Sequence, residues 1–259
     1  VSGMMNVLNC DHGSCYMRGA YFAMAIAVYT GQFWLTLAVA PLALLVIGAV
    51  VERFLLRKVH VLGHVHELLL TFGLAYIIQE GVKWIWGNNP QAINVSGLLA
   101  STVHLGGIVY PVYRLFIIGL SLAVLGLLSL VLFRTRLGTI VRAAVSDPDM
   151  VSVLGVNTRR VFMLVFGLGT WMAGVAGVAA APILTVFPGL ADQMGMDAFV
   201  VVVVGGFGSL FGALVAALFL GELNAFGIQF IPKLSPVLMF AFMALVLAFK
   251  PTGLFGDRE

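Results

Sequence analysis

The chain carries a small cluster of potential metal ligands near its start. Cys10, Asp11, His12 and Cys15 offer thiolate, carboxylate and imidazole groups, which are ligand types that zinc accepts. Four ligands with the spacing of a closed tetrahedral site are not evident, and two cysteines this close together do not indicate a disulfide framework. We therefore expect no metal site and no cofactor in this chain.

A second polar set falls on one helical face. Asn6, Asn9 and His12 recur at intervals of three residues in an otherwise apolar stretch. Such side chains either contact a polar substrate or form hydrogen bonds to neighbouring helices, and the spacing does not choose between the two. They are the first candidates for a substrate path.

Other polar clusters have simpler interpretations. Glu80 and Lys83 lie three residues apart on a predicted helix, where either an ion pair or snorkelling explains both. A run of histidines with one acid lies at a predicted membrane boundary, and its members are His60, His64, His66 and Glu67. We expect this run to form a solvated rim, and we assign Glu80 and Lys83 no role in transport.

The composition indicates an integral membrane protein. Of the 259 residues, 61% are hydrophobic and 10% are charged, and the mean hydropathy is +1.07, whereas soluble domains carry about 25% charged residues. The net charge of +3 comes mostly from loops, where membrane orientation explains it, so we expect no nucleic-acid partner. The sequence also lacks a phosphate-binding loop, a His-Glu-x-x-His zinc helix and a Gly-x-Ser-x-Gly elbow. Any energy coupling must therefore come from another protein.

Apolar windows predict membrane spans, each of which needs about 20 residues of helix. The first five are expected at Tyr16–Tyr29, Phe33–Val51, Leu68–Trp86, Leu115–Phe133 and Val161–Phe187. Arg18 lies within the first of them, and a charge at that depth favours a segment that lines a cavity. Because the chain opens at Val1 without the pattern of a signal peptide, we expect it to be a fragment from which an upstream membrane helix is missing.

The predicted loops alternate in charge. Glu52–His64 carries three basic residues and is predicted to be cytoplasmic, whereas Gly87–Pro111 and Pro188–Gly195 carry none and are predicted to be external. The orientation is therefore consistent through the first five spans.

The loop of residues 134–160 holds five arginines and is also predicted to be cytoplasmic. Within it we predict a helix over Pro148–Leu154, because Asp147 can cap its first turn, Pro148 has a preset φ, and Gly155 can end it. The apolar residues of this helix suit either docking of a soluble partner or a position flat on the lipid surface. From the residues alone, both interpretations are open.

The segment after the fifth span is interrupted. Asp197–Val204 and Leu210–Leu220 are each too short to cross a bilayer. The interruption holds Gly205, Gly206, Gly208 and Ser209. We predict a re-entrant or discontinuous helix whose break lies at the translocation path and allows helix movement. The chain then reaches the outside by Glu222 and returns to the cytoplasm along Pro236–Phe249.

Five motifs, in order, carry a resemblance to one family. They are Gly3-Met4-Met5-Asn6-Val7-Leu8-Asn9 with His12-Gly13 and Tyr16-Met17-Arg18-Gly19-Ala20-Tyr21; Leu70-Thr71-Phe72-Gly73-Leu74; Arg142-Ala143-Ala144 through Asp147-Pro148 to Leu154-Gly155-Val156-Asn157; Gly205-Gly206-Phe207-Gly208-Ser209 with Gly212; and Pro251-Thr252-Gly253-Leu254-Phe255-Gly256. Together they resemble the LivH/LivM-type permeases of ATP-binding-cassette (ABC) importers for branched-chain amino acids, with the LivH side closer. The resemblance covers nearly the whole chain and begins one helix after the family's usual start.

The resemblance implies a fold and partners. The fold is an all-α integral membrane protein of the ABC importer permease type, with one permease domain over residues 1–259. This domain is a bundle of about six to eight membrane segments in the bacterial or archaeal cytoplasmic membrane, one of them broken or re-entrant. The implied partners are ABC ATPase subunits that bind ATP and Mg, a second permease, homologous or identical, an external substrate-binding protein and the lipid bilayer.

The resemblance also assigns site residues and favours docking for the cytoplasmic helix. The coupling residues are Arg142, Ala143, Ala144, Asp147, Pro148 and Gly155. The substrate path is assigned to Asn6, Asn9, His12, Gly13, Thr71 and Gly73. On this interpretation the chain is a transport subunit and not an enzyme, and the family's substrates span branched-chain and other amino acids, urea and short amides.

Two rival functions remain. A self-sufficient channel or secondary transporter would use the broken helix and Arg18 as its gate, and transport without any ATPase would favour it. A membrane enzyme would need the Cys10–Cys15 cluster at its centre, and loss of activity on replacing both cysteines would favour that.

Overall fold

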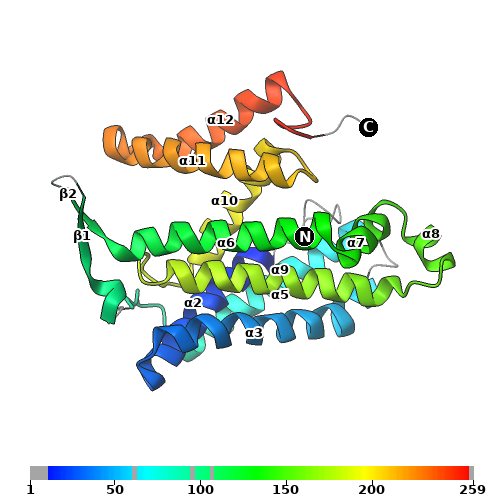
Figure 1. Ribbon diagram of the computed structural model, residues 1–259, viewed down its shortest axis with the longest axis horizontal. Helices are drawn as coiled ribbons and strands as arrows, with labels where there is room; N and C mark the ends of the chain where they lie inside the picture. Colours follow the sequence, from blue (N-terminus) through cyan, green and yellow to red (C-terminus); the bar gives the residue numbers. More distant parts are fainter. Residues whose placement is uncertain (1–10, 60–62, 94–96, 106–107, 257–259) are drawn as a thin grey trace. The chain divides into compact units, whose positions relative to one another are not determined.

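Five helices are long and apolar enough to cross a membrane within the residues that the structure describes, which are 11–59, 63–93, 97–105 and 108–256. The structure is a computed structural model, drawn in Figure 1. The five candidate spans are Phe33–Val59, Val65–Trp86, Val112–Arg134, Thr158–Ala180 and Leu210–Phe230. They confirm the predicted multi-span helical fold.

The described chain divides into two compact units, one of residues 11–192 and one of residues 193–256. The larger unit holds α2 (Asp11–Thr30), α3 (Phe33–Val51), α5 (His64–Trp86), α6 (Val112–Arg134), α7 (Arg136–Ser146), α8 (Pro148–Val153) and α9 (Thr158–Ala180). The smaller unit is built from most of α10 (Leu190–Gly205), α11 (Leu210–Phe230), the 3-10 turn η4 (Pro232–Leu234) and α12 (Ser235–Phe249).

The core of the larger unit is the contact of α2 and α3 with α9. A Cβ added at Gly19 would lie 2.7 Å from the Gly174 carbonyl oxygen, and one added at Gly48 would overlap the Thr170 side chain. Thr170 Oγ1 donates to the Leu44 carbonyl oxygen at 3.1 Å, which joins α9 to α3. Small residues and interhelical hydrogen bonds are what hold helices together in lipid, where apolar burial alone gives no preference.

The helix that begins at Phe33 continues beyond its apolar run. A π-helical turn, η1 (Glu52–Leu56), and α4 (Arg57–Val59) extend it where a loop was predicted. Glu52 is 4% exposed, so this charged residue is buried within the unit and does not mark a solvated helix end. The predicted loop Glu52–His64 is therefore helical over residues 52–59.

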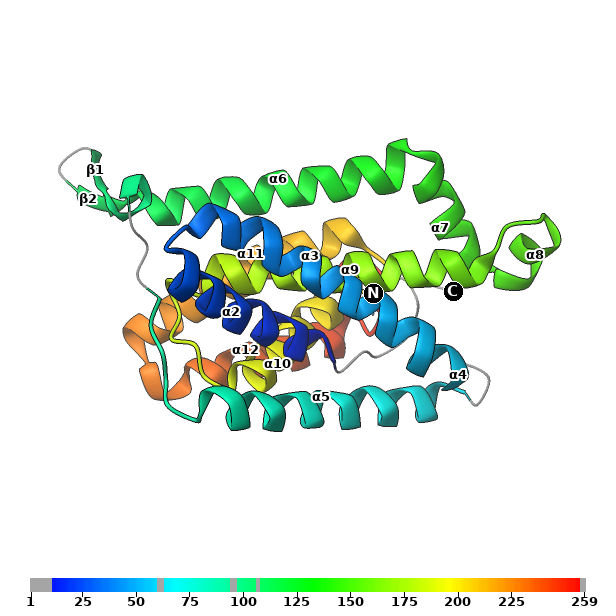
Figure 2. The ribbon, with the colours of Figure 1, turned by 90° about the horizontal axis from the view of Figure 1, so that it is seen from below.

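The predicted external loop 87–111 contains a short 3-10 turn, η3 (Gly97–Ala100), and two strands. β1 (Thr102–Leu105) and β2 (Ile108–Pro111) pair in antiparallel register, with Val103 opposite Tyr110. The all-α prediction missed them because four residues are too few for a clear alternating pattern. In both Figure 1 and Figure 2 this hairpin and α8 lie at opposite ends of the larger unit. Their predicted external and cytoplasmic positions are consistent with this arrangement.

Two predicted spans have different bounds in the structure. α2 begins at Asp11 instead of Tyr16, and α9 ends at Ala180 instead of continuing to Phe187. Pro182 has no N–H to continue the helix, and the chain turns there. Val186 then exchanges two backbone hydrogen bonds with Gln91, at 2.8 and 2.9 Å.

In the smaller unit, α11 corrects the prediction of two short pieces. It runs through Glu222 to Phe230 and is by itself long enough to span the membrane. One acid does not end a helix whose neighbours remain apolar. Near its far end, Asn224 Oδ1 accepts a hydrogen bond from Ser235 Oγ at 2.6 Å, which satisfies a polar group beside the turn into α12.

The break before α11 therefore lies at the end of a complete span. α10 has 16 residues, or about 24 Å of helix, which is short of the roughly 30 Å hydrocarbon core. α10, α11 and α12 share one apolar core, made of Val200, Val204, Ala216, Leu220, Met239 and Val246.

Candidate functional site

The loop between α6 and α9 folds into two capped helices. Thr135 Oγ1 accepts a hydrogen bond from the Gly138 N–H at 3.2 Å and caps α7. Asp147 Oδ1 accepts from the Met150 N–H at 2.9 Å and caps α8, with Pro148 in the first turn. Each cap satisfies an amide that a helix start leaves without an intrahelical partner. The predicted start of α8 is confirmed.

The end of α8 lies at Val153, one residue before the predicted end. Gly155 has a φ of +83°, and its N–H donates to the Ser152 carbonyl oxygen at 3.0 Å. The Val156 N–H donates to the Val151 carbonyl oxygen at 3.3 Å. A left-handed glycine with bonds of this kind commonly closes a helix.

α8 displays three apolar side chains. Met150, Val153 and Leu154 are 59%, 82% and 75% exposed, whereas Val151 is 7% exposed. Val151 therefore attaches α8 to the rest of the unit, and the other three remain uncovered. An exposed apolar surface on a rigidly capped helix is suited to binding another surface.

The predicted coupling residues on α7 differ in exposure. Arg142 and Ala143 are exposed, and the Arg142 guanidinium carbon lies 5.2 Å from the centre of the Phe133 ring. Ala144 is fully buried, because α7 packs against α6 and α9. Ala144 is therefore placed to position α7 within the unit, and its assignment to ATPase coupling stays a prediction.

The described residues of the predicted substrate path lie on α2 and α5, which pack against each other. In the first turn of α2, His12 is partly exposed and Gly13 is buried. On α5, Thr71 is 1% exposed and its hydroxyl donates to the Leu68 carbonyl oxygen at 3.0 Å. A Cβ added at Gly73 would meet nothing within 4 Å. The path assignment itself stays a prediction.

Asn6, Asn9 and Cys10 lie outside the described residues. Within the part of the chain that the structure describes, no group of three or more His, Cys, Asp or Glu side chains is placed to hold a metal ion. Cys15 is buried, and its Sγ accepts a hydrogen bond from Arg18 Nη2 at 3.0 Å.

The same two helices each carry a buried charge. Arg18 on α2 is 8% exposed, and its Nε donates to the Ser14 carbonyl oxygen at 3.3 Å. Glu67 on α5 is 3% exposed, which corrects the prediction of a solvated rim for this residue, whereas His66 is exposed as predicted. Glu67 and Thr71 are four positions apart, so both fall on one face of α5. The spacing of four residues was the sequence signal for this shared face.

The interruption around Gly206 is a backbone turn. Gly206 and Gly208 have φ values of +97° and +82°. Ser209 Oγ accepts from the Gly212 N–H at 3.0 Å and caps α11. The predicted break is present here, while its role in helix movement stays a prediction.

The segment after α12 closes this turn. The Leu254 N–H donates to the Val204 carbonyl oxygen at 2.8 Å, and the Phe255 N–H donates to the Gly205 carbonyl oxygen at 3.1 Å. A Cβ added at Gly206 would lie 2.7 Å from Gly256 Cα. Two motifs that are distant in sequence, residues 205–209 and 251–256, thus form one packed joint.

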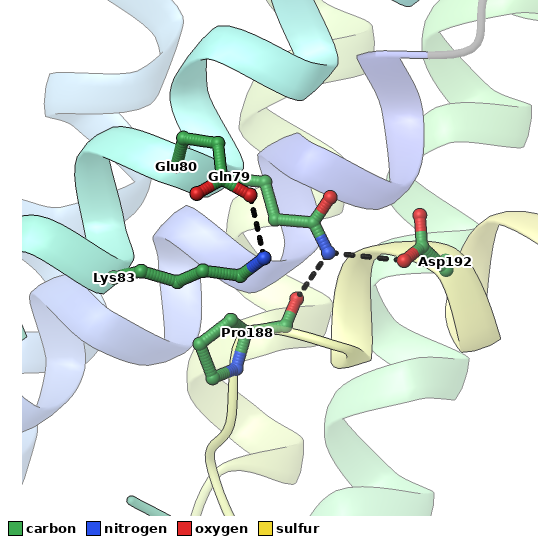
Figure 3. Close-up of polar contacts among 5 residues, drawn as sticks. All are labelled: Gln79, Glu80, Lys83, Pro188 and Asp192. Atoms are coloured by element: carbon green, nitrogen blue, oxygen red, sulfur yellow. Dashed lines mark hydrogen bonds and ion pairs between the residues drawn. The ribbon is translucent and has the colours of Figure 1, made fainter. Parts of the chain in front are cut away.

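Figure 3 shows a polar cluster that the sequence analysis missed. Gln79 on α5 is 9% exposed, and its Nε2 donates to the Pro188 carbonyl oxygen at 3.1 Å and to Asp192 Oδ2 at 3.0 Å. Beside it, Lys83 Nζ lies 2.6 Å from Glu80 Oε1, so of the two explanations given for this pair the structure has the ion pair. Gln79 therefore joins α5 to the beginning of α10, and an amide within an apolar run was the signal for it.

The apolar spans and the folded loop define a multi-pass membrane protein. The model of the family described as "Branched-chain amino acid transport system / permease component" matches residues 1–247, and the chain belongs to that family. It is therefore a permease subunit of an importer in the cytoplasmic membrane, and it is not an enzyme.

Curated relatives span bacteria and an archaeon. The high-affinity branched-chain amino acid transport system permease protein LivH of Salmonella typhimurium is 30% identical over 274 residues, covering 100% of this chain and 89% of the relative. BraD of Pseudomonas aeruginosa is 29% identical over 273 residues, with the same coverage. A probable LivH permease of Methanocaldococcus jannaschii is 24% identical over 276 residues, covering 97% and 84%. No solved structure matches the chain.

Proposed function

We propose that this permease moves branched-chain amino acids into the cytoplasm and takes its energy from ABC ATPase subunits. The observation that carries the proposal is the family match over residues 1–247, supported by relatives whose names specify branched-chain amino acids. The permease itself performs no covalent step. ATP and Mg bind to the partner subunits, and this chain needs no cofactor of its own.

Coupling runs through α8. Met150, Val153 and Leu154 enter a groove of the ATPase, since they form an exposed apolar surface on a helix that is capped at both ends. The buried side chains Val151 and Ala144 pass the motion of the docked helix to α7 and the spans behind it. Capping supports this role because a frayed helix would absorb the motion.

The remaining assembly follows the family. A second permease completes the translocation path, and an external substrate-binding protein delivers the amino acid on the side of the β1–β2 hairpin. His12, Gly13, Thr71 and Gly73 contribute the path on α2 and α5, with Asn6 and Asn9 preceding them. Gly205, Gly206, Gly208 and Ser209 form the joint at which α10 and α11 change their relative direction.

Affinity purification of the tagged full-length protein from native membranes tests this proposal. We expect an ATPase and a second permease to remain bound in mild detergent. Reconstituted with the binding protein, the complex should take up radiolabelled leucine only when ATP is present inside the vesicles. Excess unlabelled isoleucine should compete, whereas excess urea should not.

Two results would contradict the proposal. Uptake by the purified chain without any ATPase would favour a channel or secondary transporter. Competition by urea or acetamide, with none by isoleucine, would leave the importer function in place but show that its substrate is urea or a short amide.

A further inference from the structure

A concave site lies where α3 continues into η1 and α4, beside the start of α9. Its cavity has a volume of about 340 Å³, within the roughly 300–1,000 Å³ range of ligand pockets. Its lining residues are Glu52, Arg53, Arg57, Asn157, Arg159, Arg160 and Met163. Arginine is thus the dominant residue type, and the site is separate from the apolar surface of α8.

Membrane orientation does not explain why four arginines line one cavity. The positive-inside rule depends on how many basic residues flank a span and not on where they point. Here Arg53 and Arg57 come from one helix and Arg159 and Arg160 from another, yet all four line one cavity. The contact of α3 with α9, joined by the Thr170 hydrogen bond, brings them together.

The charge of the cavity is strongly positive. Among the described residues that line it, Glu52 is the only acid, and it is buried at 4% exposure. Within the described part of the chain, none of the four arginines forms an ion pair. A guanidinium presents a planar fork of N–H donors that matches two oxygens of a phosphate or carboxylate.

The backbone around the cavity also favours an anion. Asn157 Oδ1 accepts from the Arg160 N–H at 3.3 Å and caps α9, so the positive end of this helix begins at the cavity wall. On the opposite wall, Leu56 is 2% exposed and holds η1 against the unit while Arg53 and Arg57 remain exposed. Short π-helical turns of this kind are frequent at functional sites.

We propose that this cavity binds a phosphate-bearing anion through its four arginines. Two sources can supply that chemistry, an anionic phospholipid headgroup or soluble phosphate. The apolar residues Val51 and Val161 directly adjoin the arginine-bearing segments, so the cavity lies at the level where a span leaves the hydrocarbon. Basic pockets between helices on the cytoplasmic side are suited to lipid headgroups.

Native mass spectrometry of the full-length protein in detergent tests the site with three separate probes. These are short-chain phosphatidylglycerol, short-chain phosphatidylcholine and inorganic phosphate. We expect phosphatidylglycerol to bind at least tenfold more tightly than phosphatidylcholine, because only the former carries a net negative charge. This comparison uses the unaltered protein and needs no variant.

A pair of double variants then locates the binding. Arg159→Gln with Arg160→Gln should weaken it roughly 30-fold. Arg134→Gln with Arg136→Gln removes the same charge from the same side of the membrane but outside the cavity, and should change binding by no more than about twofold.

Each outcome decides the proposal. If only Arg159→Gln with Arg160→Gln loses phosphatidylglycerol binding, the ligand is a lipid headgroup. If only this double variant loses binding of inorganic phosphate, the ligand is a soluble anion. Equal loss in both double variants, or no loss in either, overturns the site. Equal binding of phosphatidylglycerol and phosphatidylcholine by the unaltered protein, with no binding of phosphate, also overturns it.

Discussion

Gly155 at the end of α8 and Gly206 at the end of α10 have similar backbones, with φ values of +83° and +97°. Their surroundings differ. A Cβ added at Gly155 would meet nothing within 4 Å, whereas one added at Gly206 would lie 2.7 Å from Gly256 Cα. The first turn ends a displayed helix, and the second is closed by a distant segment of the same unit. A positive φ therefore marks a position that favours glycine, but only the neighbours decide how large the penalty for a side chain is.

The largest effect is expected at the packed turn. Gly206→Ala adds a strained left-handed residue and a backbone clash, which together should lower the free energy of unfolding by about 2–5 kcal/mol. Thermal unfolding in detergent, followed by circular dichroism, measures it. Gly221→Ala on α11 is the matched control, since its Cβ would meet nothing within 4 Å. Equal unfolding midpoints for the two variants would mean that the turn at Gly206 tolerates a side chain as well as an open helical position does.

At the turn of Gly155, where a side chain would meet no neighbour, a substitution is expected to cost only backbone strain. Gly155→Val should cost about 1–2 kcal/mol, enough to loosen the end of α8 and reduce both ATPase retention and ATP-driven uptake. Gly155→Asn should retain more of both, because asparagine tolerates the left-handed region. Undiminished assembly and transport in Gly155→Val would count against the role of this turn in coupling.

A slightly smaller loss of stability than at Gly155 is expected at the start of α8. Asp147→Ala removes the acceptor of the Met150 N–H, and loss of such a cap costs about 1 kcal/mol. Hydrogen exchange at the Met150 amide should accelerate by about fivefold. Asp149→Ala is the control in the same turn, and it should change that exchange less. An unchanged Met150 amide in Asp147→Ala would mean that the cap does not hold α8.

The smallest effect on stability is expected on the displayed face. Leu154→Ser should change the free energy of unfolding by less than about 0.5 kcal/mol, because Leu154 is 75% exposed. It should nevertheless weaken retention of the ATPase in the affinity purification. Val151→Ser, at a side chain that is 7% exposed, should lower the unfolding midpoint instead. Full ATPase retention in Leu154→Ser would remove the apolar face of α8 from the docking surface.

Local signals were enough for much of the fold. The start of α3 at Phe33 and the start of α8 at Pro148 agree with the predictions, because apolar length and capping depend on consecutive residues. Predictions failed where a local signal was weak, or where the surrounding residues outweighed it. The four-residue strands were too short to detect, and α11 continues through Glu222 although the chain was expected to leave the membrane there.

The sequence by itself determined that this chain crosses a membrane several times and carries a capped helix between α6 and α9, since hydropathy and helix ends are properties of neighbouring residues. Tertiary structure alone decided that Ala144 and Glu67 are buried, that residues 251–256 close the turn at Gly206, and that four arginines share one cavity. The physical reason is that burial and convergence depend on which helices pack together. Close backbone contacts between residues far apart in the chain, such as Gly19 with Gly174, make that choice.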